Sequence, residues 1–338
     1  MMEGYVGCGT SEKLCPGDGQ PCIRISDITE MGQLKKVALS CRGDAPMLEK
    51  GDILFARVGN HMFKSYLYDP ADGKLSFASF LIRFHIEKDN PKYVQYYALS
   101  PRFQTFIQAS CAGSTRNVVG ARELQAIPLP HTDRADQDAV VEKLAPIYES
   151  YAVAYKKEMV LDQYARDRFA NLFPVSAQTG TVLLSELAVR KAGKGKKDTG
   201  GPVPIYNSGG ITGGTFEAMP EKEAILIPKK GSLNNVIYAS RPFWASGTMA
   251  RLLPKEKYDM YFLYCLLRSC NLMLLNSDSN APGIHPSILD SLTLPDYPKE
   301  LKQQFYMEME PFFHEIGILR KKQRILQELF YELCGQYF

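Results

Sequence analysis

The sequence lacks the segments that direct a chain into or through a membrane. No apolar run approaches the roughly 20 residues that a membrane-spanning helix needs. The first residues, Met1-Met2-Glu3-Gly4, do not show the basic and then apolar pattern of a signal peptide. We therefore expect a cytoplasmic protein.

Catalytic and cofactor-binding motifs are also absent from the sequence. The chain contains no Pro-Pro pair, which excludes the Asn/Asp-Pro-Pro-aromatic segment of adenine methyltransferases. Gly7-Cys8-Gly9 does not follow a strand of a βαβ unit, and Lys194–Lys197 lacks the glycine spacing of a phosphate-binding loop. The five histidines show no metal-ligand spacing. We expect no catalytic residue, no cofactor and no metal.

Eight cysteines are present, and four of them lie near the N-terminus. These four, Cys8, Cys15, Cys22 and Cys41, do not have the paired two-residue spacing of structural zinc sites. We expect reduced thiols, with zinc binding by this cluster as the alternative.

The second half of the chain repeats the first. A slightly larger offset applies near the start of each copy, where Gly59 falls on Gly231. A repeat unit of half the chain is too long for a solenoid repeat. The chain therefore holds two tandem copies of a domain-sized module, with an approximate internal twofold. One constant offset pairs similar positions along the rest of the chain, namely Tyr93 with Tyr258, Tyr96 with Tyr261, Pro130 with Pro295, Pro146 with Pro311, Leu161 with Leu326 and Phe173 with Phe338.

Each copy ends in a long helix with apolar residues in alternating steps of four and three. This spacing of 3.5 residues is typical of a coiled coil, and one polar position in each helix, Glu158 and Gln323, would fix the register. A helix of about 36 residues is roughly 54 Å long, more than a head of this size needs. The alternative is that each helix packs on its own head. The expected interface residues are Leu144, Ile147, Tyr151, Glu158, Leu161, Phe312, Ile316, Leu319, Gln323, Leu326 and Phe330.

Two prolines, Pro146 and Pro311, fall at matching places early in these helices. Proline lacks the amide hydrogen that a helix interior uses. Each should therefore kink its helix or mark the helix's first turn.

The part of each copy before the long helix predicts a head of mixed α and β structure. Short β-rich runs include 52–56, 66–68, 80–84, 224–227 and 236–238, with two further strands ending in proline at 127–130 and 292–295. Aromatic-rich helices are expected over 93–109 and 258–275, and an exposed Gly/Lys-rich loop over 192–202. The predicted fold class is α+β, divided as head 1–134, helix 135–175, head 176–297 and helix 298–338.

The small net charge of +3 is concentrated in the heads. Residues 1–134 hold 16 Lys and Arg against 14 Asp and Glu, and residues 176–297 hold 13 against 10. The distribution is compatible with nucleic-acid contact by the heads, although the excess alone is too small to establish it.

Several short sequence segments, in the same order in both copies, resemble segments of the specificity subunit of type I restriction-modification systems. Residues 205–213, Ile-Tyr-Asn-Ser-Gly-Gly-Ile-Thr-Gly, are similar to the segment that opens a target recognition domain of that family. Residues 227–232 and 281–284 resemble its Lys-Gly-Ser turn and its Pro-Gly segment. In the first copy, residues 23–28 and 50–59 resemble its Ile-Ser-Asp-Ile and Gly-Asp-Ile-Leu strands. The similarity extends from about Ile23 to Phe338.

The resemblance implies a DNA-reading subunit without catalysis. Each head would bind one half of a split double-stranded DNA target. The helices would pair antiparallel, hold the heads at a set spacing, and recruit methyltransferase (M) subunits and restriction (R) subunits. Two alternatives stay open: a scaffold or decoy of the same architecture that does not read DNA, and an unrecognised nuclease.

One group of candidate DNA contacts lies in the turns after the strands 52–56 and 224–227, near Gly59 and Gly231. A second group lies before the long helix. Arg and Lys suit phosphate contact and guanine readout, and Asn suits adenine readout. The alternative is an ordinary polar loop. The candidates are Arg57, Asn60, His61, Lys64, Arg116, Asn117, Arg122, Ser208, Lys229, Lys230, Ser232, Asn234 and Asn235.

Overall fold

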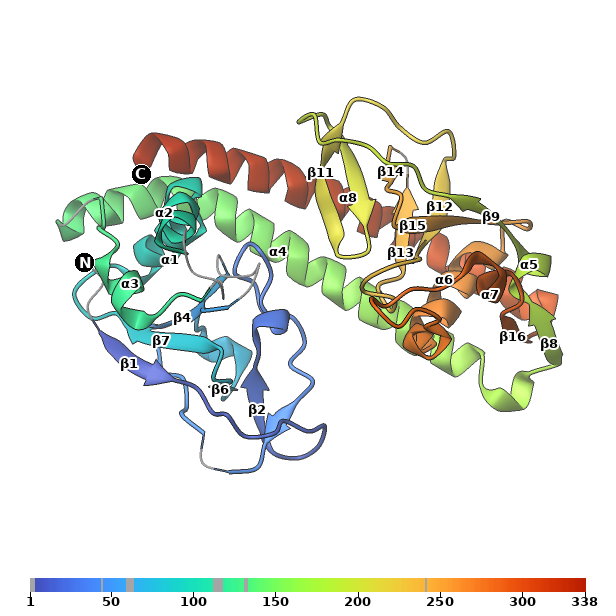
Figure 1. Cartoon of the computed structure of the whole chain (residues 1–338), viewed down its shortest axis with the longest axis horizontal. Coiled ribbons are helices and arrows are strands. Elements are labelled where there is room, and N and C mark those ends of the chain that lie inside the picture. Colours follow the sequence, from blue (N-terminus) through green and yellow to red (C-terminus); the bar gives the residue numbers. More distant parts are fainter. Residues whose placement is uncertain (1–3, 44, 59–63, 112–117, 131–132, 241) are drawn as a thin grey trace. The chain divides into compact units, whose positions relative to one another are not determined.

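The computed structural model describes residues 4–43, 45–58, 64–111, 118–130, 133–240 and 242–338. The chain divides into two compact units, Met1–Lys156 with Lys321–Phe338, and Lys157–Arg320. Two 39-residue helices, α4 (Arg134–Leu172) and α8 (Lys299–Tyr337), each contribute one segment to each unit (Figure 1).

Among its described residues, the first unit contains a four-stranded antiparallel sheet, a small three-stranded sheet and three short α-helices. The strand orders are β1-β7-β4-β5 and β3-β2-β6. The strands are β1 (Tyr5–Cys8), β2 (Gln20–Ile23), β3 (Ser40–Cys41), β4 (Asp52–Ala56), β5 (Ser65–Leu67), β6 (Ser76–Phe77) and β7 (Leu81–His85), and the helices are α1 (Pro91–Leu99), α2 (Pro101–Cys111) and α3 (Ala121–Ala126).

The second unit has the same two sheets and one further strand pair. The orders are β9-β15-β12-β13, β11-β10-β14 and β8-β16. The strands are β8 (Gly180–Leu183), β9 (Ala188–Ala192), β10 (Val203–Asn207), β11 (Gly210–Thr215), β12 (Glu223–Pro228), β13 (Ile237–Ser240), β14 (Trp244–Ala245), β15 (Met249–Pro254) and β16 (Thr293–Asp296), and the helices are α5 (Leu184–Leu187), α6 (Asp259–Ser269) and α7 (Pro286–Asp290).

Backbone hydrogen bonds show that the two small sheets are equivalent. In the first unit, the amide of Ala78 donates to Ile23 O at 2.9 Å, next to the parallel pair β2–β6. In the second, the amide of Ser246 donates to Tyr206 O at 2.9 Å, next to the parallel pair β10–β14. The repeat seen in the sequence is therefore a repeat of structure.

The core of each unit joins its head to segments of both long helices. In the first unit, Tyr96 packs on Tyr148 of α4, with ring centroids 4.9 Å apart. Their counterparts in the second copy of the repeat, Tyr261 and Phe313 of α8, stack in the second unit at 4.2 Å. Each helix thus packs on a head as well as on the other helix.

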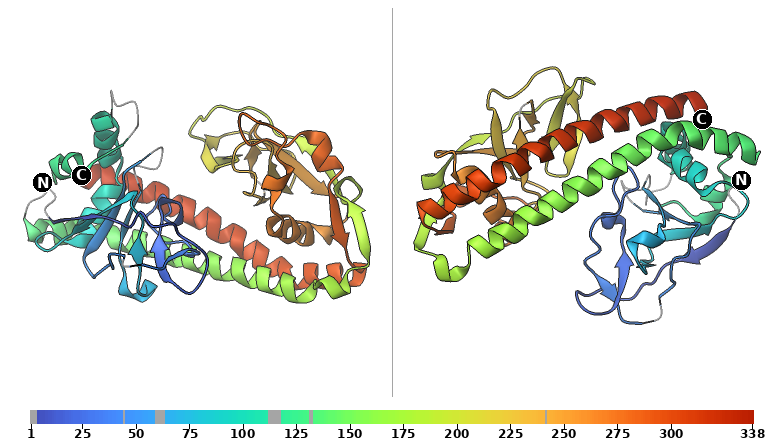
Figure 2. Two further views of the ribbon diagram at one scale, coloured as in Figure 1. Left: turned by 60° about the horizontal axis from the view of Figure 1, so that its bottom comes forward. Right: turned by 180° about the vertical axis from the view of Figure 1, so that it is seen from behind.

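The predicted antiparallel coiled coil is confirmed. In the second unit, contacts run from Phe169–Phe305 through Tyr164–Phe312 to Lys157–Glu315, so residue numbers fall in α4 as they rise in α8. In the first unit, Tyr148 lies against Phe330, with centroids 5.6 Å apart. Figure 2 shows the two helical segments of each unit side by side.

The expected interface residues take different positions in the helix pair. Leu144, Tyr151, Ile316, Leu319 and Phe330 are buried, and Ile147, Leu161, Phe312 and Leu326 are half-buried against the cores. Glu158 accepts a 2.7 Å hydrogen bond from Arg320 Nε, while Gln323 is half-buried.

Several details of the sequence-based prediction were wrong. Residues 127–130 form no strand; Ile127 and Leu129 are buried instead as irregular chain between α3 and α4. The helix expected over 93–109 is broken at Ser100, because Pro101 starts a new helix. Of the two alternatives for Pro146 and Pro311, the first-turn position is wrong, because both prolines lie inside α4 and α8.

None of the helices in the described part of the chain combines the length and the apolar character that a membrane span requires.

Phe330 tests the contribution of α8 to the first unit. Its ring is fully buried between Tyr96 and Tyr148. Phe330→Ala leaves a cavity there, so we expect a loss of about 3–5 kcal/mol in the free energy of unfolding, measured by urea denaturation. The control, Ile325→Ala, removes a side chain that is 53% exposed in the same helical segment and should change stability by less than about 0.5 kcal/mol. Equal losses for the two variants would contradict the described packing.

Candidate nucleic-acid interface

In each unit the turn after the central strand lies next to the end of the small sheet. In the second unit, the amide of Lys229 donates to Thr248 O at 2.8 Å, and Lys229 O accepts from the amide of Ile284 at 2.9 Å. In the first unit, Arg57 makes the same two bonds, to Phe80 and from Val119. Arg57 and Lys229 therefore occupy equivalent positions, as predicted by the offset that pairs Gly59 with Gly231.

Three segments of the second head meet around Gly231. Its amide donates to Pro282 O at 2.8 Å, and its backbone has φ +86°, which favours glycine. Asn235 Nδ2 donates to Ser208 O at 2.9 Å, which holds the turn after β10 beside the turn after β12. The residues predicted from separate segments, Ser208 and the 229–235 group, are thus brought together.

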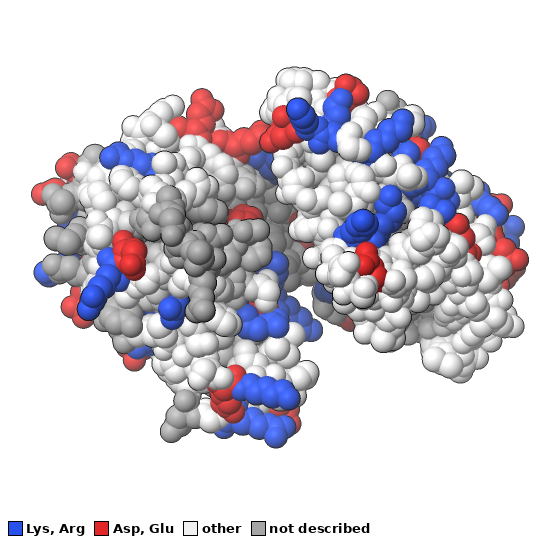
Figure 3. Space-filling model, in the orientation of Figure 1, with Lys and Arg blue, Asp and Glu red and all other residues white. Residues whose placement is uncertain are grey.

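Positive charge is concentrated at this junction. Burial lowers the pKa of Lys229, and the nearby charges of Arg190 and Lys230 lower it further. Arg190 is held by Asp290 through two 2.7 Å bonds, whereas Lys230 is exposed. Figure 3 shows Lys and Arg side chains gathered on a face of the second head. An anion such as a DNA phosphate would relieve the repulsion among these cations.

The other predicted residues of the 229–235 group differ in how much they are already engaged. The amide side chain of Asn234 donates to Asn271 Oδ1 at 3.1 Å and accepts from the amide of Met273 at 3.2 Å. Ser232 is exposed. Lys230 and Ser232 are therefore better placed than Asn234 to contact a ligand without breaking bonds inside the head.

The Lys-rich loop after β9 lies at the same end of the second head, and the sequence analysis did not include it among the DNA contacts. Lys194 is fixed at the small sheet, since its amide donates to Ala245 O at 2.9 Å and its carbonyl accepts from Trp244 Nε1 at 2.9 Å. Lys196 lies 5.0 Å from the centroid of the Trp244 ring, and Lys197 is exposed. The high proportion of lysine in this loop is the feature of the sequence that could have identified it as a candidate DNA contact.

In the first head, the predicted residues are spread over different environments. Arg57 is half-buried, with one guanidinium nitrogen 3.5 Å from Cys8 Sγ, and Arg122 is exposed at the start of α3. Lys64 is buried, and its ammonium donates to Ile28 O at 2.8 Å and lies 3.5 Å from Glu30. Lys64 is thus committed to internal contacts. Asn60, His61, Arg116 and Asn117 lie outside the described residues.

The cysteines in the described part of the chain show no arrangement for metal binding. Among the described residues, no group of three or more His, Cys, Asp or Glu side chains is placed to hold a metal ion. Burial raises the pKa of Cys22 to about 11 and those of Cys265 and Cys334 to about 12, so these thiols stay protonated at neutral pH.

Comparison with known proteins gives a family match for the second half of the chain. Residues 172–328 match the family model of the type I restriction modification DNA specificity domain. No curated protein matches the sequence.

Solved structures align with nearly the whole chain at low identity. The S subunit of a type I restriction-modification system from M. genitalium aligns with a TM-score of 0.48 and 20% identity, over 96% of this chain and 93% of that chain. The HsdS subunit from Thermoanaerobacter tengcongensis aligns with a TM-score of 0.34 and 15% identity, over 93% of this chain and 88% of that chain.

Gly231 tests the local geometry of the junction. An alanine Cβ there would lie 2.6 Å from Ser208 Oγ on a backbone with φ +86°. We expect Gly231→Ala to cost about 1–2 kcal/mol of stability, measured by urea denaturation. Gly247→Ala is the matched control, because its Cβ would meet no atom closer than 3.7 Å. If both variants were equally stable, the left-handed conformation of Gly231 would be incorrect.

Proposed function

We propose, from the match of residues 172–328 to the family model of the type I restriction modification DNA specificity domain, that the chain is the DNA sequence-specificity subunit of such a system. Each head binds one half of a bipartite double-stranded DNA target. The observation that carries the proposal is the pair Lys229 and Lys230 at the turn after β12, which is equivalent to the turn of the first head that holds Arg57. Arg and Lys held at a fixed end of a fold position a protein on the phosphate backbone, while neighbouring polar side chains read bases.

We assign the interface to the ends of the small sheets and the turns beside them. In the second head it comprises Ser208, Lys229, Lys230, Ser232, Asn234 and Asn235, to which we add Lys194 and Lys197. In the first head it comprises Arg57 and Arg122, together with Asn60, His61, Arg116 and Asn117. Lys64 is left out because its ammonium is bound inside the head.

The remaining parts of the proposal follow from the family. The heads extend over 1–134 and 176–297, and the helical segments over 135–175 and 298–338 bind the methyltransferase subunits. Restriction subunits join through that complex. The chain itself performs no catalysis, holds no cofactor, and acts in the cytoplasm where the DNA lies.

The first test concerns phosphate contact. The double variant Lys229→Ala/Lys230→Ala should weaken DNA binding on all sequences. It should also make the negative slope of log K against log salt less steep by about 1.8, that is, about 0.9 for each lost contact. The measurement is a mobility shift at several salt concentrations. Lys255→Ala is the control, because Lys255 lies exposed beyond the far end of β15, where its amide bonds to Leu187 O at 2.9 Å. An unchanged slope in the double variant would remove the second head's turn from the interface.

The second test concerns the biological role. Methylated sites are mapped across the genome in cells with the gene, without it, and with it restored. We expect a split motif to lose methylation in the deletion and to regain it on restoration. If the chain is instead a scaffold that does not read DNA, methylation patterns will be unchanged and pooled duplexes will show no sequence-dependent retention.

A further inference from the structure

The two heads present different side chains at the same place in the fold. The amide of Thr10 donates to Phe77 O at 2.9 Å, as the amide of Lys194 donates to Ala245 O at 2.9 Å. The segments 10–12, 24–26 and 78–80 of the first head thus correspond to 194–196, 207–209 and 246–248 of the second. Among these described segments, those of the second head carry lysines and those of the first head do not.

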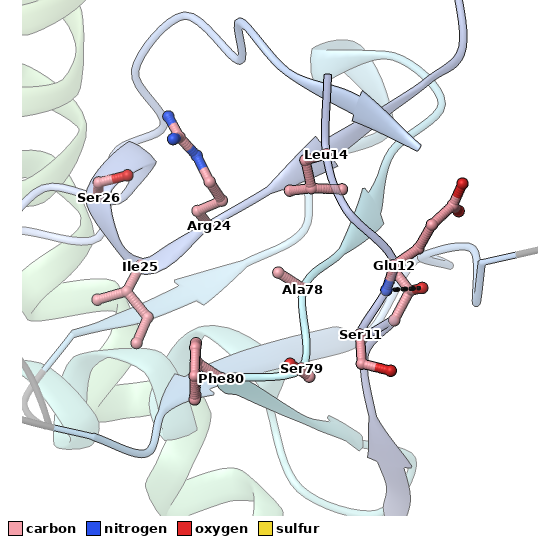
Figure 4. A pocket seen from close by; sticks show the side chains of 10 residues that line it. Ser11, Glu12, Leu14, Arg24, Ile25, Ser26, Ala78, Ser79 and Phe80 are labelled. Atoms are coloured by element: carbon pink, nitrogen blue, oxygen red, sulfur yellow. Dashed lines mark hydrogen bonds between the residues drawn. The ribbon is translucent and has the colours of Figure 1, made fainter. Parts of the chain in front are cut away.

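The first head has an open pocket at this place. It has a volume of about 450 Å³ and lies between the loop after β1, the turn after β2 and the turn after β6. Figure 4 shows Ile25, Ala78 and Phe80 facing the same space, with Leu14 nearby. Phe80 is 59% exposed, which is costly for a large apolar ring unless a partner covers it.

The carboxylates near the pocket are already engaged in bonds within the head. Glu12 accepts bonds of 3.0–3.2 Å from the amides of Arg42 and Gly43, so its carboxylate already holds a turn. Asp27 is buried and accepts from Arg24 at 2.8 Å. Lys13 and Arg42 lie exposed next to Glu12, and Arg24 lines the pocket itself. An apolar floor beside Arg24 fits the major-groove edge of DNA, where the methyl group of a thymine is exposed.

We propose that this pocket binds the 5-methyl group of a thymine, so that the first head reads at least one A·T pair of its half-site through Phe80 and Ile25. Thymine is the one base that presents a methyl group in the major groove, and apolar side chains recognise it there. The inference rests on the proposed function and deepens it. The second head, with Lys194, Ser208 and Thr248 at the equivalent described positions, offers no such apolar surface and reads its half-site differently.

The experiment replaces thymine by uracil, which removes the methyl group and leaves base pairing intact. The recognised duplex is first selected from random DNA with the full-length chain, alone and with its methyltransferase partner. Each thymine of that duplex is then replaced in turn, and affinities are measured at fixed salt. We expect one replacement in one half-site to weaken binding about fourfold, the factor that corresponds to burying one methyl group.

Two variants assign the effect to the pocket. Phe80→Ala should bind the thymine and uracil duplexes with equal affinity, whereas Phe80→Leu should keep part of the difference in affinity between them. Phe216→Ala is the matched control, because Phe216 is a 74% exposed phenylalanine of the second head and its loss should leave the difference intact. Both rings are exposed, so neither variant should impair folding.

The outcomes separate this inference from the proposed function. If the wild-type chain selects no sequence, the proposed function fails. If it selects a sequence but no uracil replacement weakens binding, the methyl pocket is overturned. A replacement effect that persists in Phe80→Ala also overturns it, because the methyl group would then be read elsewhere.

Discussion

The structure depends on the burial of two helical segments, one from each long helix, in the core of each head. The first unit buries Val140 and Leu144 of α4 together with Phe330 and Cys334 of α8. The second unit buries Phe169 of α4 together with residues of α8 such as Phe305. Neither half of the chain contains all the residues of one core. The two copies of the repeat therefore fold as one interdependent molecule, and a half-length chain that ended after α4 would leave the first core without its α8 side.

Polar groups fix the position of the helices on the heads. Arg320 of α8 donates to Glu158 of α4 at 2.7 Å and to Tyr238 O of the second head at 2.9 Å, so one guanidinium joins three elements. Lys302, which is buried, lies 2.6 Å from Asp296 and 3.6 Å from Asp259. A sliding helix would leave these buried charges without partners, and that cost is larger than the loss of a few apolar contacts. Apolar packing thus provides the affinity between helix and head, and the charges select one register.

The equivalent position in the first unit holds a neutral residue. Gln137 is the counterpart of Lys302 at the offset that pairs Pro130 with Pro295. It is fully buried, and it binds Asp89 through its Nε2 and the amide of Asn90 through its Oε1. Both residues attach the start of a long helix to its head. The repeat has kept the attachment and changed its chemistry from an amide to an ion pair.

The sequence predicted the parts of the fold that depend on local periodicity. The heptad pattern predicted both long helices and their pairing, because an apolar spacing of 3.5 residues sustained over many turns is typical of a coiled coil. The β-rich runs located β4 and β12 correctly, since a short run of consecutive apolar residues between turns, such as 53–56 and 224–227, is typical of a buried strand. Residues 127–130 were wrongly assigned to a strand. Their apolar side chains are buried, but the segment pairs with no strand that the structure describes. An apolar pattern shows that a segment is buried, and it does not show whether a neighbouring strand forms hydrogen bonds with it.

The same limit applies to the candidate interface. The repeat offset paired Arg57 with Lys229, and the hydrogen bonds of both turns bear out the pairing. It did not reveal that Lys64 points into the head, or that Phe80 points out of it. Side-chain direction at a strand end depends on which neighbouring loops cover it, and those loops come from distant parts of the chain. The lysines after β9 were visible in the sequence, but their place beside Ser208 depends on the parallel pair β10–β14.

The equivalent backbone bonds show how one fold can present two different surfaces at the same place. At the ends of the small sheets, the two heads share main-chain bonds at equivalent positions. Ile25 in place of the equivalent Ser208, and Phe80 in place of Thr248, leave these shared bonds unchanged and alter the surface that each turn presents. The internal hydrogen bonds constrain shape, while the outward side chains are free to differ. A duplicated head built in this way can change the surface of one copy without altering either the other copy or the helices between them.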